Sequence, residues 1–204
     1  MILPTLNIEN TLWQKGHKYI VGIDEVGRGS WAGPLVAAGV ILPQDFQIPL
    51  GLADSKLIKP QTRNKLSDII KKTALGYYIA EISSYEIDKI GVGKATFVAF
   101  RKIFRSISPQ ADFCVIDAFH IKYLDRKKQM AIASGDKICA SISAASIIAK
   151  VYRDNLMKSL HFKYPNYGFG KHKGYGTQAH QEAIRKYGFT KIHRSSYNLN
   201  YLFA

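Results

Sequence analysis

The sequence predicts an α/β domain in which a mixed central sheet is flanked by helices and followed by a small helical C-terminal region. Short apolar segments of strand type dominate the first half, a long segment with helical spacing comes later, and loops and a helix fill the end. No repeat, low-complexity stretch or Pro/Gly/Ser-rich linker divides the 204 residues. We therefore expect one domain over residues 1–204, in which residues from about 160 to 204 form an extension of helices and loops.

The predicted strands are short apolar runs that end at turn residues. They span residues 19–24, 35–42, 75–82 and 113–117. The first two flank the glycine-spaced segment EVGRGSWAGP, which predicts a hairpin with a glycine-rich connection.

The predicted helices follow from composition and from apolar residues that recur every three or four positions. They span residues 60–72, 84–107, 137–160 and 177–187, and the second is interrupted around Gly91 and Gly93. The third carries, at helical spacing, Ile138, Ile142, Ala145, Ile148, Ala149 and Tyr152.

The chain is strongly basic, with 29 Lys and Arg against 15 Asp and Glu and a formal net charge of +14. This excess favours a polyanionic partner, nucleic acid first, although ribosomal proteins, membrane-surface proteins and ordinary basic enzymes share it. From Lys150 to the end, ten basic residues accompany only Asp154 and Glu182, whereas most carboxylates lie earlier. The distribution predicts a substrate-contacting C-terminal region next to a catalytic body.

Nothing in the sequence predicts export or a membrane span. No apolar run approaches the ~20 residues of a spanning helix, and the N-terminus lacks the pattern of a signal peptide. Cys114 and Cys139 are the only cysteines, and their spacing suits neither a zinc site nor a disulfide framework. We expect both to be buried, reduced thiols in a cytoplasmic protein without a membrane partner.

Acidic residues stand where apolar strands end. Asp24 and Glu25 close the first predicted strand and Asp117 closes the last, so their side chains can converge across the sheet. A carboxylate cluster repels itself unless a divalent cation is present, and oxygen ligands suit Mg²⁺ or Mn²⁺. A hydrolytic two-metal site is one interpretation; the other is that these residues simply begin turns. Since strand neighbours point to opposite faces, Asp24 and Glu25 share a site only if the chain bends or one offers its main-chain carbonyl.

Two glycine-rich loops are candidates for substrate binding. Gly27, Arg28 and Gly29 follow the acidic pair, and glycines let main-chain amides approach a phosphate or ribose, although a tight hairpin also explains them. Residues 168–177 (GFGKHKGYGT) combine basic side chains with an aromatic ring, as RNA recognition requires, unless this is a surface loop whose tyrosine packs on the domain. The candidate contacts in and after this loop are Lys171, His172, Lys173, Tyr175, His193 and Arg194. For the last two, a solvated charged tail is the alternative.

Two further alternatives concern residue roles. Asp136 precedes the long predicted helix, where an N-cap is the ordinary interpretation. A nuclease that uses histidines as acid and base would draw on His172, His180 and His193. The carboxylate cluster is the better explanation, because it accounts for acids that are otherwise costly to place together.

Long segments of the chain resemble the type 2 ribonuclease H family, in particular bacterial ribonuclease HII. They are GIDEVGRGSWAGPLVAAGV at 22–40, LADSK at 52–56, CVIDA at 114–118, GDKICASISAASIIAKVYRD at 135–154, YGFGKHKGYGT at 167–177 and IHRSSY at 192–197. The match covers nearly the whole chain, and several long motifs in one order are highly specific.

The resemblance implies a ribonuclease H-like fold in which four acids hold two Mg²⁺ or Mn²⁺ ions, and it selects Asp136 over Asp154 as the fourth. The implied acids are Asp24, Glu25, Asp117 and Asp136. The implied activity is endonucleolytic hydrolysis of the RNA strand of RNA·DNA hybrids and cleavage 5′ to ribonucleotides embedded in duplex DNA. Such cleavage leaves 5′-phosphate and 3′-hydroxyl ends.

The resemblance also implies substrate contacts. Residues 27–29 would contact the backbone around the ribonucleotide, Tyr175 would pack on the deoxyribose at the RNA-to-DNA junction, and Ser55 and Lys56 would contact phosphates. Ala118, Phe119 and His120 depart from the family's usual glycine and polar residues, which bears on the loop after the third acid and not on the acid itself.

The sister family, ribonuclease HIII, and two alternative functions would require sequence features that differ from those of this chain. Ribonuclease HIII typically carries GKG and a separate N-terminal DNA-binding domain, for which Asp24 lies too near the start. A non-catalytic binder of hybrids leaves the acidic cluster unexplained, and a nuclease for DNA junctions has no evident use for the GRG and KGY loops. We expect a monomeric enzyme whose partners are RNA·DNA hybrids and ribonucleotide-containing duplex DNA.

Overall fold

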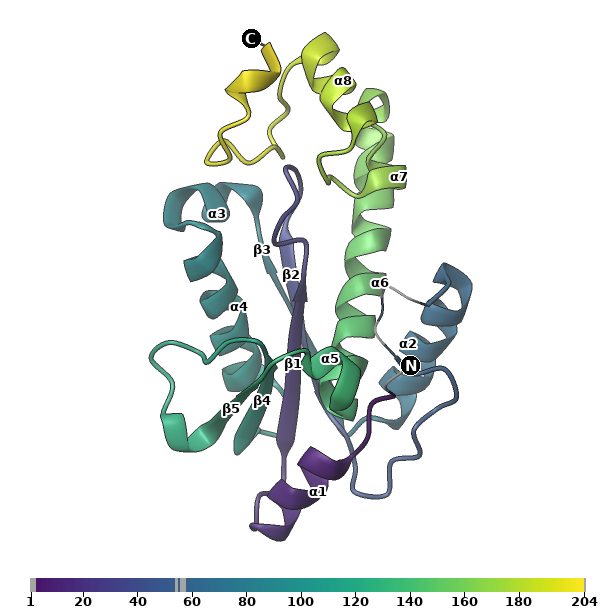
Figure 1. The fold of residues 1–204 in the computed structure, drawn as a ribbon, viewed down its shortest axis with the longest axis vertical. Helices are drawn as coiled ribbons and strands as arrows, with labels where there is room; N and C mark the ends of the chain where they lie inside the picture. The colour runs from purple at the N-terminus through teal and green to yellow at the C-terminus, as the bar shows by residue number, and fades with distance from the viewer. Residues whose placement is uncertain (1–2, 54, 56–57, 204) are drawn as a thin grey trace.

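The structure is a computed structural model that describes residues 3–53, 55 and 58–203. Its strands form one mixed sheet in the order β3-β2-β1-β4-β5 (Figure 1). They are β1 (Ile20–Val26), β2 (Leu35–Ile41), β3 (Gly76–Ile82), β4 (Phe113–Asp117) and β5 (Gln129–Ile132). β1 pairs antiparallel with β2 and parallel with β4, so the sheet changes direction at its central strand. The mixed sheet expected from the sequence is confirmed.

Eight helices occur in the described part of the chain. They are α1 (Asn7–Gln14), α2 (Pro60–Thr73), α3 (Ser84–Ile90), α4 (Val92–Ser106), α5 (Gly135–Ile138), α6 (Ala140–Lys163), α7 (Phe169–His172) and α8 (Gln178–Tyr187). The last two, α7 and α8, lie in the C-terminal region beyond the sheet (Figure 1). Short 3-10 turns are η1 (Arg126–Lys128), η2 (Pro165–Tyr167) and η3 (Asn200–Phe203). The interruption predicted around Gly91 is confirmed, because this glycine separates α3 from α4 with a φ of +79°. None of the described helices is long and apolar enough to cross a membrane.

The long helix expected over residues 137–160 is interrupted near its start. Cys139 has extended backbone (φ −110°, ψ 122°) and separates the four-residue helix α5 from α6. The interpretation of Asp136 as an N-cap is wrong, because it lies inside α5, and the residue before α5 is Ser134.

Helices cover both faces of the sheet, and β2 shows how its residues are shared between them. Leu35 and Ala37 belong to the apolar cluster formed with α4, whereas Val36 and Ala38 belong to the cluster formed with α6. This is the alternation that a strand buried on both sides requires. Asp24 and Glu25 lie at the end of the adjacent strand, β1.

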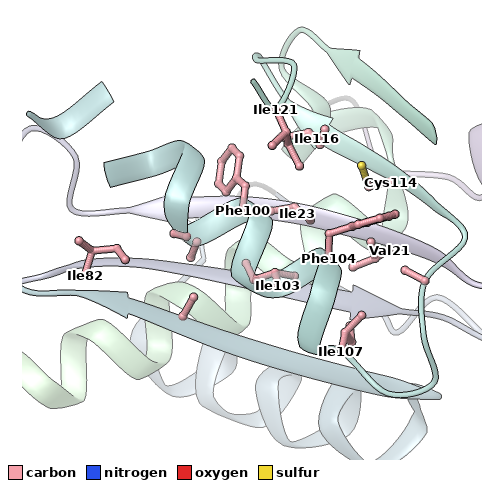
Figure 2. Packing of buried hydrophobic residues seen from close by; sticks show 14 of the residues in the cluster. Val21, Ile23, Ile82, Phe100, Ile103, Phe104, Ile107, Cys114, Ile116 and Ile121 are labelled. Atoms are coloured by element: carbon pink, nitrogen blue, oxygen red, sulfur yellow. The ribbon is translucent and has the colours of Figure 1, made fainter. Parts of the chain in front are cut away.

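The α4 face of the sheet holds a tightly packed apolar cluster. Figure 2 shows Phe100 and Ile103 of α4 beside Val21 and Ile23 of β1. Cys114 of β4 lies in the same cluster. Both cysteines are buried and free, as expected.

Helix α6, with 24 residues, connects the sheet to the C-terminal region (Figure 1). Near its end Met157 packs in a cluster that joins Ala32, from the loop between β1 and β2, to aromatic residues of the C-terminal region. On the other side, Asp88 of α3 accepts hydrogen bonds of 2.6–2.9 Å from the main-chain N–H and hydroxyl groups of Ser195 and Ser196. The C-terminal region is therefore held against the sheet by α6 and by α3.

Helix α6 lies so close to β1 that only glycine fits at position 22. A Cβ there would lie 2.2 Å from the carbonyl carbon of Ser141 and 2.5 Å from the amide nitrogen of Ile142. Both atoms belong to the backbone of α6, so they cannot move without shifting the helix.

We expect Gly22→Ala to lower the free energy of unfolding, measured by urea denaturation, by about 1–3 kcal/mol or more, the usual cost of overpacking. Gly93→Ala is the matched control, because nothing lies within 4 Å of a Cβ there and the residue stands in the first turn of α4, where alanine favours the helix. A Gly22→Ala protein as stable as the wild type would contradict the close contact between α6 and β1.

Candidate active site

A cavity of about 150 Å³ lies at the ends of β1 and β4, beside α6. Its wall contains the four acids named from the sequence, two predicted substrate contacts and three residues that were not predicted. The lining residues are Asp24, Glu25, Val26, Ser55, Asp117, Asp136, Ser146, Lys150 and Tyr175. The fold thus brings residues from two strands, two helices and two loops to one place.

Asp24 lies on the α6 side of β1, two residues after Gly22, and is 8% exposed. Its Oδ1 accepts a hydrogen bond from the Glu25 N–H at 2.7 Å, and Ser146 of α6 also hydrogen-bonds its carboxyl group. Burial, together with the negative charges of Glu25 and Asp117, raises the pKa of Asp24 well above its usual range, although the two hydrogen bonds oppose the shift. Negative charge is therefore concentrated here, where a cation would be stabilised.

Glu25 follows Asp24 on a regular strand. β1 stays paired with β2 through Val26, so the chain does not bend between the two acids. Both residues nevertheless line the cavity, which lies where the strand ends. A shared site for both acids required either a bend in the chain or a main-chain carbonyl as one ligand. The bend is absent.

Asp117 and Asp136 are brought together by the turn before α5. Oδ1 of Asp117 accepts a hydrogen bond from the N–H of Gly135 at 2.7 Å. Asp136 is the next residue and is 6% exposed. The end of β4 is therefore tied directly to the residue that precedes the fourth acid.

The donor chemistry of the cavity fits Mg²⁺ or Mn²⁺. Its wall carries four carboxylates and neither His nor Cys, which is the oxygen-rich set that hard divalent cations prefer. Lys150, the basic residue in the wall, is paired with Asp154 at 2.7 Å. Across residues 3–53, 55 and 58–203, no three Asp, Glu, His or Cys side chains converge closely enough to hold an ion. The acids are thus distributed around the wall and do not form a closed cage.

Ser146 and Lys150 are candidate site residues that sequence reasoning missed. They stand four residues apart on α6, and both line the cavity. The Ser146 hydroxyl lies 2.9 Å from that of Ser55, a predicted phosphate contact that the structure buries. Lys56, the other predicted contact of that segment, lies outside the described residues. The one feature of the sequence that could have indicated Ser146 is a serine among the apolar residues of a predicted helix.

Residues 27–29 form the start of the loop between β1 and β2. Gly29 is exposed, and the guanidinium of Arg28 lies 4.7 Å from the ring centroid of Phe119 in the loop after β4. Gly27 has a φ of +86°, and a Cβ there would lie 2.1 Å from Nε of Arg153, so the position requires glycine. The GRG segment therefore rests on α6 while its second glycine faces solvent.

Arg194 is not the surface contact that the sequence predicted. It is 1% exposed, and its five N–H groups donate to the main-chain carbonyls of Gly27, Arg28 and Gly33 and to the hydroxyl of Tyr197, at 2.7–3.1 Å. Because every N–H is used inside the protein, none is left for a phosphate. The prediction of a direct phosphate contact is wrong.

Two histidines form a buried hydrogen-bonded chain next to the glycine-rich loop over residues 168–177, which contains Tyr175 and is hereafter called the tyrosine loop. The N–H of Thr190 donates to Nδ1 of His193 at 2.8 Å, so Nε2 of His193 carries the proton and donates to Nε2 of His180 at 3.1 Å. His180 then donates from Nδ1 to the carbonyl of Tyr175 at 3.0 Å. Burial lowers the pKa of His180 and of His193 to about 4, so both rings are neutral at pH 7.

His172 is also used internally. Its Nδ1 accepts from the N–H of Gly174 at 3.2 Å and its Nε2 donates to the carbonyl of Tyr167 at 2.6 Å, while burial lowers its pKa. The predicted phosphate contacts of His172 and His193 are wrong, because their ring nitrogens already have partners. The histidine-nuclease alternative fails for the same reason.

Of the remaining residues in the tyrosine loop, Lys173 is hydrogen-bonded within the loop, whereas Lys171 and Tyr175 are exposed. Lys173 turns back, and its Nζ donates to the carbonyls of Gly170 and Lys171. Its side chain is therefore used within the loop and not directed to a phosphate. Lys171 itself is exposed, and Tyr175 is 37% exposed and lines the acidic cavity.

The neutral histidines predict how stability depends on pH. Histidine titrates near pH 6.5 in the unfolded chain but near pH 4 at positions 180 and 193 of the folded protein, so the unfolded state binds more protons between these values. We expect the stability contributed by both to be full above about pH 6.5 and to be lost progressively as the pH falls toward 4. Urea denaturation at a series of pH values measures the loss, and NMR titration of the ring protons assigns it; ring pKa values near 6.5 for His180 and His193 would contradict it.

Comparisons with known proteins identify the family and the fold of the chain. The family model for Ribonuclease HII matches residues 21–200. A Ribonuclease HII from Acetivibrio thermocellus is 45% identical over 194 residues, which cover 95% of this chain and 75% of that protein. The crystal structure of the ribonuclease H2 from Pyrococcus horikoshii OT3 has a TM-score of 0.74 and 26% identity, covering 89% of this chain and 94% of that one.

A more distant structure shares the fold. Bst-RNase HIII, in complex with Mn²⁺, has a TM-score of 0.64 at 19% identity, covering 83% of this chain and 63% of that one. The ribonuclease H-like fold implied by the sequence motifs is thus confirmed. The chain belongs to the ribonuclease HII family, and it is an endoribonuclease of the ribonuclease H type.

Proposed function

We propose that this endonuclease hydrolyses the RNA strand of RNA·DNA hybrids and cuts 5′ to ribonucleotides embedded in duplex DNA, leaving 5′-phosphate and 3′-hydroxyl ends. The observation that carries the proposal is an acidic cavity that shares its wall with an exposed tyrosine and borders the GRG loop. Tyr175 lines the cavity, and Gly27 follows Glu25 by two residues. One site can therefore hold both the scissile phosphodiester and the sugar beside it.

In this proposal two Mg²⁺ or Mn²⁺ ions are held by Asp24, Glu25, Asp117 and Asp136. Two-metal chemistry supplies activation of the attacking water and stabilisation of the leaving 3′ oxygen. The chain's own groups orient the ligands: Ser146 hydrogen-bonds Asp24, and the N–H of Gly135 hydrogen-bonds Asp117. The Mn²⁺ complex of Bst-RNase HIII, which shares the fold, supports this choice of metal.

Recognition of the ribonucleotide is assigned to residues 27–29 and Tyr175. Main-chain amides of a glycine loop contact a 2′-hydroxyl without a side chain in between, and a tyrosine ring packs on the deoxyribose across the junction. The formal net charge of +14 supplies general attraction to the phosphate backbone. Lys171, which is exposed in the tyrosine loop, is the remaining candidate there for a phosphate contact.

We assign the protein to the cytoplasm as a monomer whose partners are RNA·DNA hybrids and ribonucleotide-containing duplex DNA. Two buried free thiols agree with a reducing compartment. The alternative from another class, a non-catalytic binder of hybrids, would keep the basic surface. It has no use for four acids around one cavity.

Asp117→Asn tests the catalytic site on a labelled DNA duplex that contains one ribonucleotide. We expect the wild type to cut 5′ to the ribonucleotide with Mg²⁺ or Mn²⁺ and not with EDTA, and the variant to lose roughly 10²-fold or more in rate, because a charge that holds the metals is removed. Asp68→Asn makes the same chemical change on the exposed side of α2 and should leave the rate unchanged. A duplex that is bound by the wild type but left intact with either metal would favour the binder.

Tyr175 is tested by two substitutions on the same substrate. Tyr175→Ala should lower kcat/KM by roughly 5- to 100-fold, since an aromatic contact with a nucleotide contributes ~1–3 kcal/mol, whereas Tyr175→Phe keeps the ring and most of the activity. Tyr85→Ala removes an exposed tyrosine on α3 as the control. Unchanged kcat/KM for Tyr175→Ala would exclude the assigned contact.

A further inference from the structure

The loop between β1 and β2 is supported from beneath by two arginines that no part of the proposed mechanism uses. Arg153 comes from α6 and Arg194 from the segment after α8, and their exposures are 0% and 1%. Arg153 donates to the carbonyls of Pro34 and Lys173 at 2.9 and 3.0 Å. It also donates to the Ser30 hydroxyl at 2.7 Å.

The acceptors of these two guanidinium groups are neutral. Arg153 is hydrogen-bonded to three main-chain carbonyls and one hydroxyl, and so is Arg194. Six of these eight acceptors belong to the loop over residues 27–34, and the other two are the Lys173 carbonyl and the Tyr197 hydroxyl. Burial lowers the pKa of Arg153 to about 10, so it remains charged at neutral pH. Asp154 and Asp88 interact with Arg153 and Arg194, respectively, through their charges, but no carboxylate in the described part of the chain accepts a hydrogen bond from either guanidinium. Burying a cation without a hydrogen-bonded anion is costly, and well-packed apolar residues would fill the same space at lower cost.

The hydrogen bonds of Arg194 set the orientation of the GRG peptides. The carbonyls of Gly27 and Arg28 both accept from Arg194, at 2.7 and 2.8 Å. In a planar trans peptide the N–H points away from the carbonyl, so the N–H groups of Arg28 and Gly29 are directed away from the buried cation. Gly29 is exposed. The carbonyls thus face inward and the donors face the side that an incoming sugar or phosphate approaches.

We propose that Arg153 and Arg194 are positioning residues that hold residues 27–34 in the conformation that distinguishes a ribonucleotide from a deoxyribonucleotide. The inference rests on the proposed function for its substrate. Each arginine donates hydrogen bonds to several carbonyls at once from its planar guanidinium group, and lysine cannot reproduce this geometry. Two cations beneath the loop also make its outer face more attractive to the oxygen atoms of the nucleic-acid backbone.

The test compares Arg153→Lys and Arg194→Lys in the Asp117→Asn background, with Mg²⁺ present. Kd is measured for a labelled DNA duplex with one ribonucleotide and for the same duplex without it. We expect the ratio of the two Kd values to move toward one by roughly tenfold, because hydrogen bonds to a charged group are lost, while Kd for all-DNA duplex changes by less than about twofold. A general structural defect would instead weaken both duplexes alike, and that result would overturn the proposal.

Hydrogen–deuterium exchange of the peptide that covers residues 27–34 provides a second readout that needs no substrate. We expect faster exchange in both lysine variants, confined to this loop and its neighbours; unchanged loop protection together with an unchanged Kd ratio would falsify the inference. If the Asp117→Asn parent itself shows no preference for the ribonucleotide, the proposed function fails, and the exchange data still decide whether the arginines hold the loop.

Two further variants complete the design. Arg185→Lys is the control, because Nε of Arg185 donates to the carbonyl of Leu202 in the C-terminal region and not to the loop, so both readouts should match the parent. If the lysine variants fail to fold, Tyr197→Phe replaces them. It removes the hydroxyl that accepts from Arg194 and donates to the Arg28 carbonyl, and the same two readouts should shift in the same direction by a smaller factor.

Discussion

The close approach of α6 to β1 is the constraint on which the rest of the structure depends. At Gly22 the helix backbone fills the space of a missing side chain, and this contact sets which face of α6 looks toward the strand and the loop that follows it. That face presents, at intervals of three or four residues, Ser146, Lys150, Arg153 and Met157. Ser146 hydrogen-bonds Asp24, and Lys150 lines the cavity. Arg153 supports the loop between β1 and β2, and Met157 packs into the C-terminal region. One helix therefore contacts the acidic cavity, the loop between β1 and β2, and the C-terminal region.

Around this helix, some polar side chains hold the backbone of the loops and others face the cavity. Residue type alone does not distinguish these two roles. Arg194, His180 and His172 point inward, where they hold carbonyls and an amide of the two glycine-rich loops. In the proposed function, the loops offer main-chain groups and one aromatic ring to the substrate. Specificity of this kind depends on backbone conformation, so the side chains that secure the backbone matter as much as those at the cavity.

Most of the sheet and the three acids at strand ends could be predicted from the sequence. A short apolar run indicates a strand, and the acid that ends the run is adjacent in sequence, so both can be recognised without knowledge of distant contacts. Asp136 entered only through the motif around it, since its place beside Asp117 depends on a turn that no local pattern announces. Ser146 and Lys150 were missed because their role follows from the rotation of α6 against β1. Helix α1 and strand β5 were missed as well, because eight residues of mixed composition and four residues after a charged turn carry little periodicity.

Arg194 contacts the carbonyls of Gly27 and Arg28 across 167 and 166 residues of sequence. The loop over residues 27–34 therefore lies near the start of the sequence but is held by a residue close to its end. During synthesis the strands can pair and the acids can gather as soon as α6 has emerged from the ribosome, whereas the loop acquires its last support only when position 194 has followed. The order of translation thus separates assembly of the four acids from completion of the loop that we propose recognises the ribonucleotide, and a chain shortened before position 194 would lack this support of the loop.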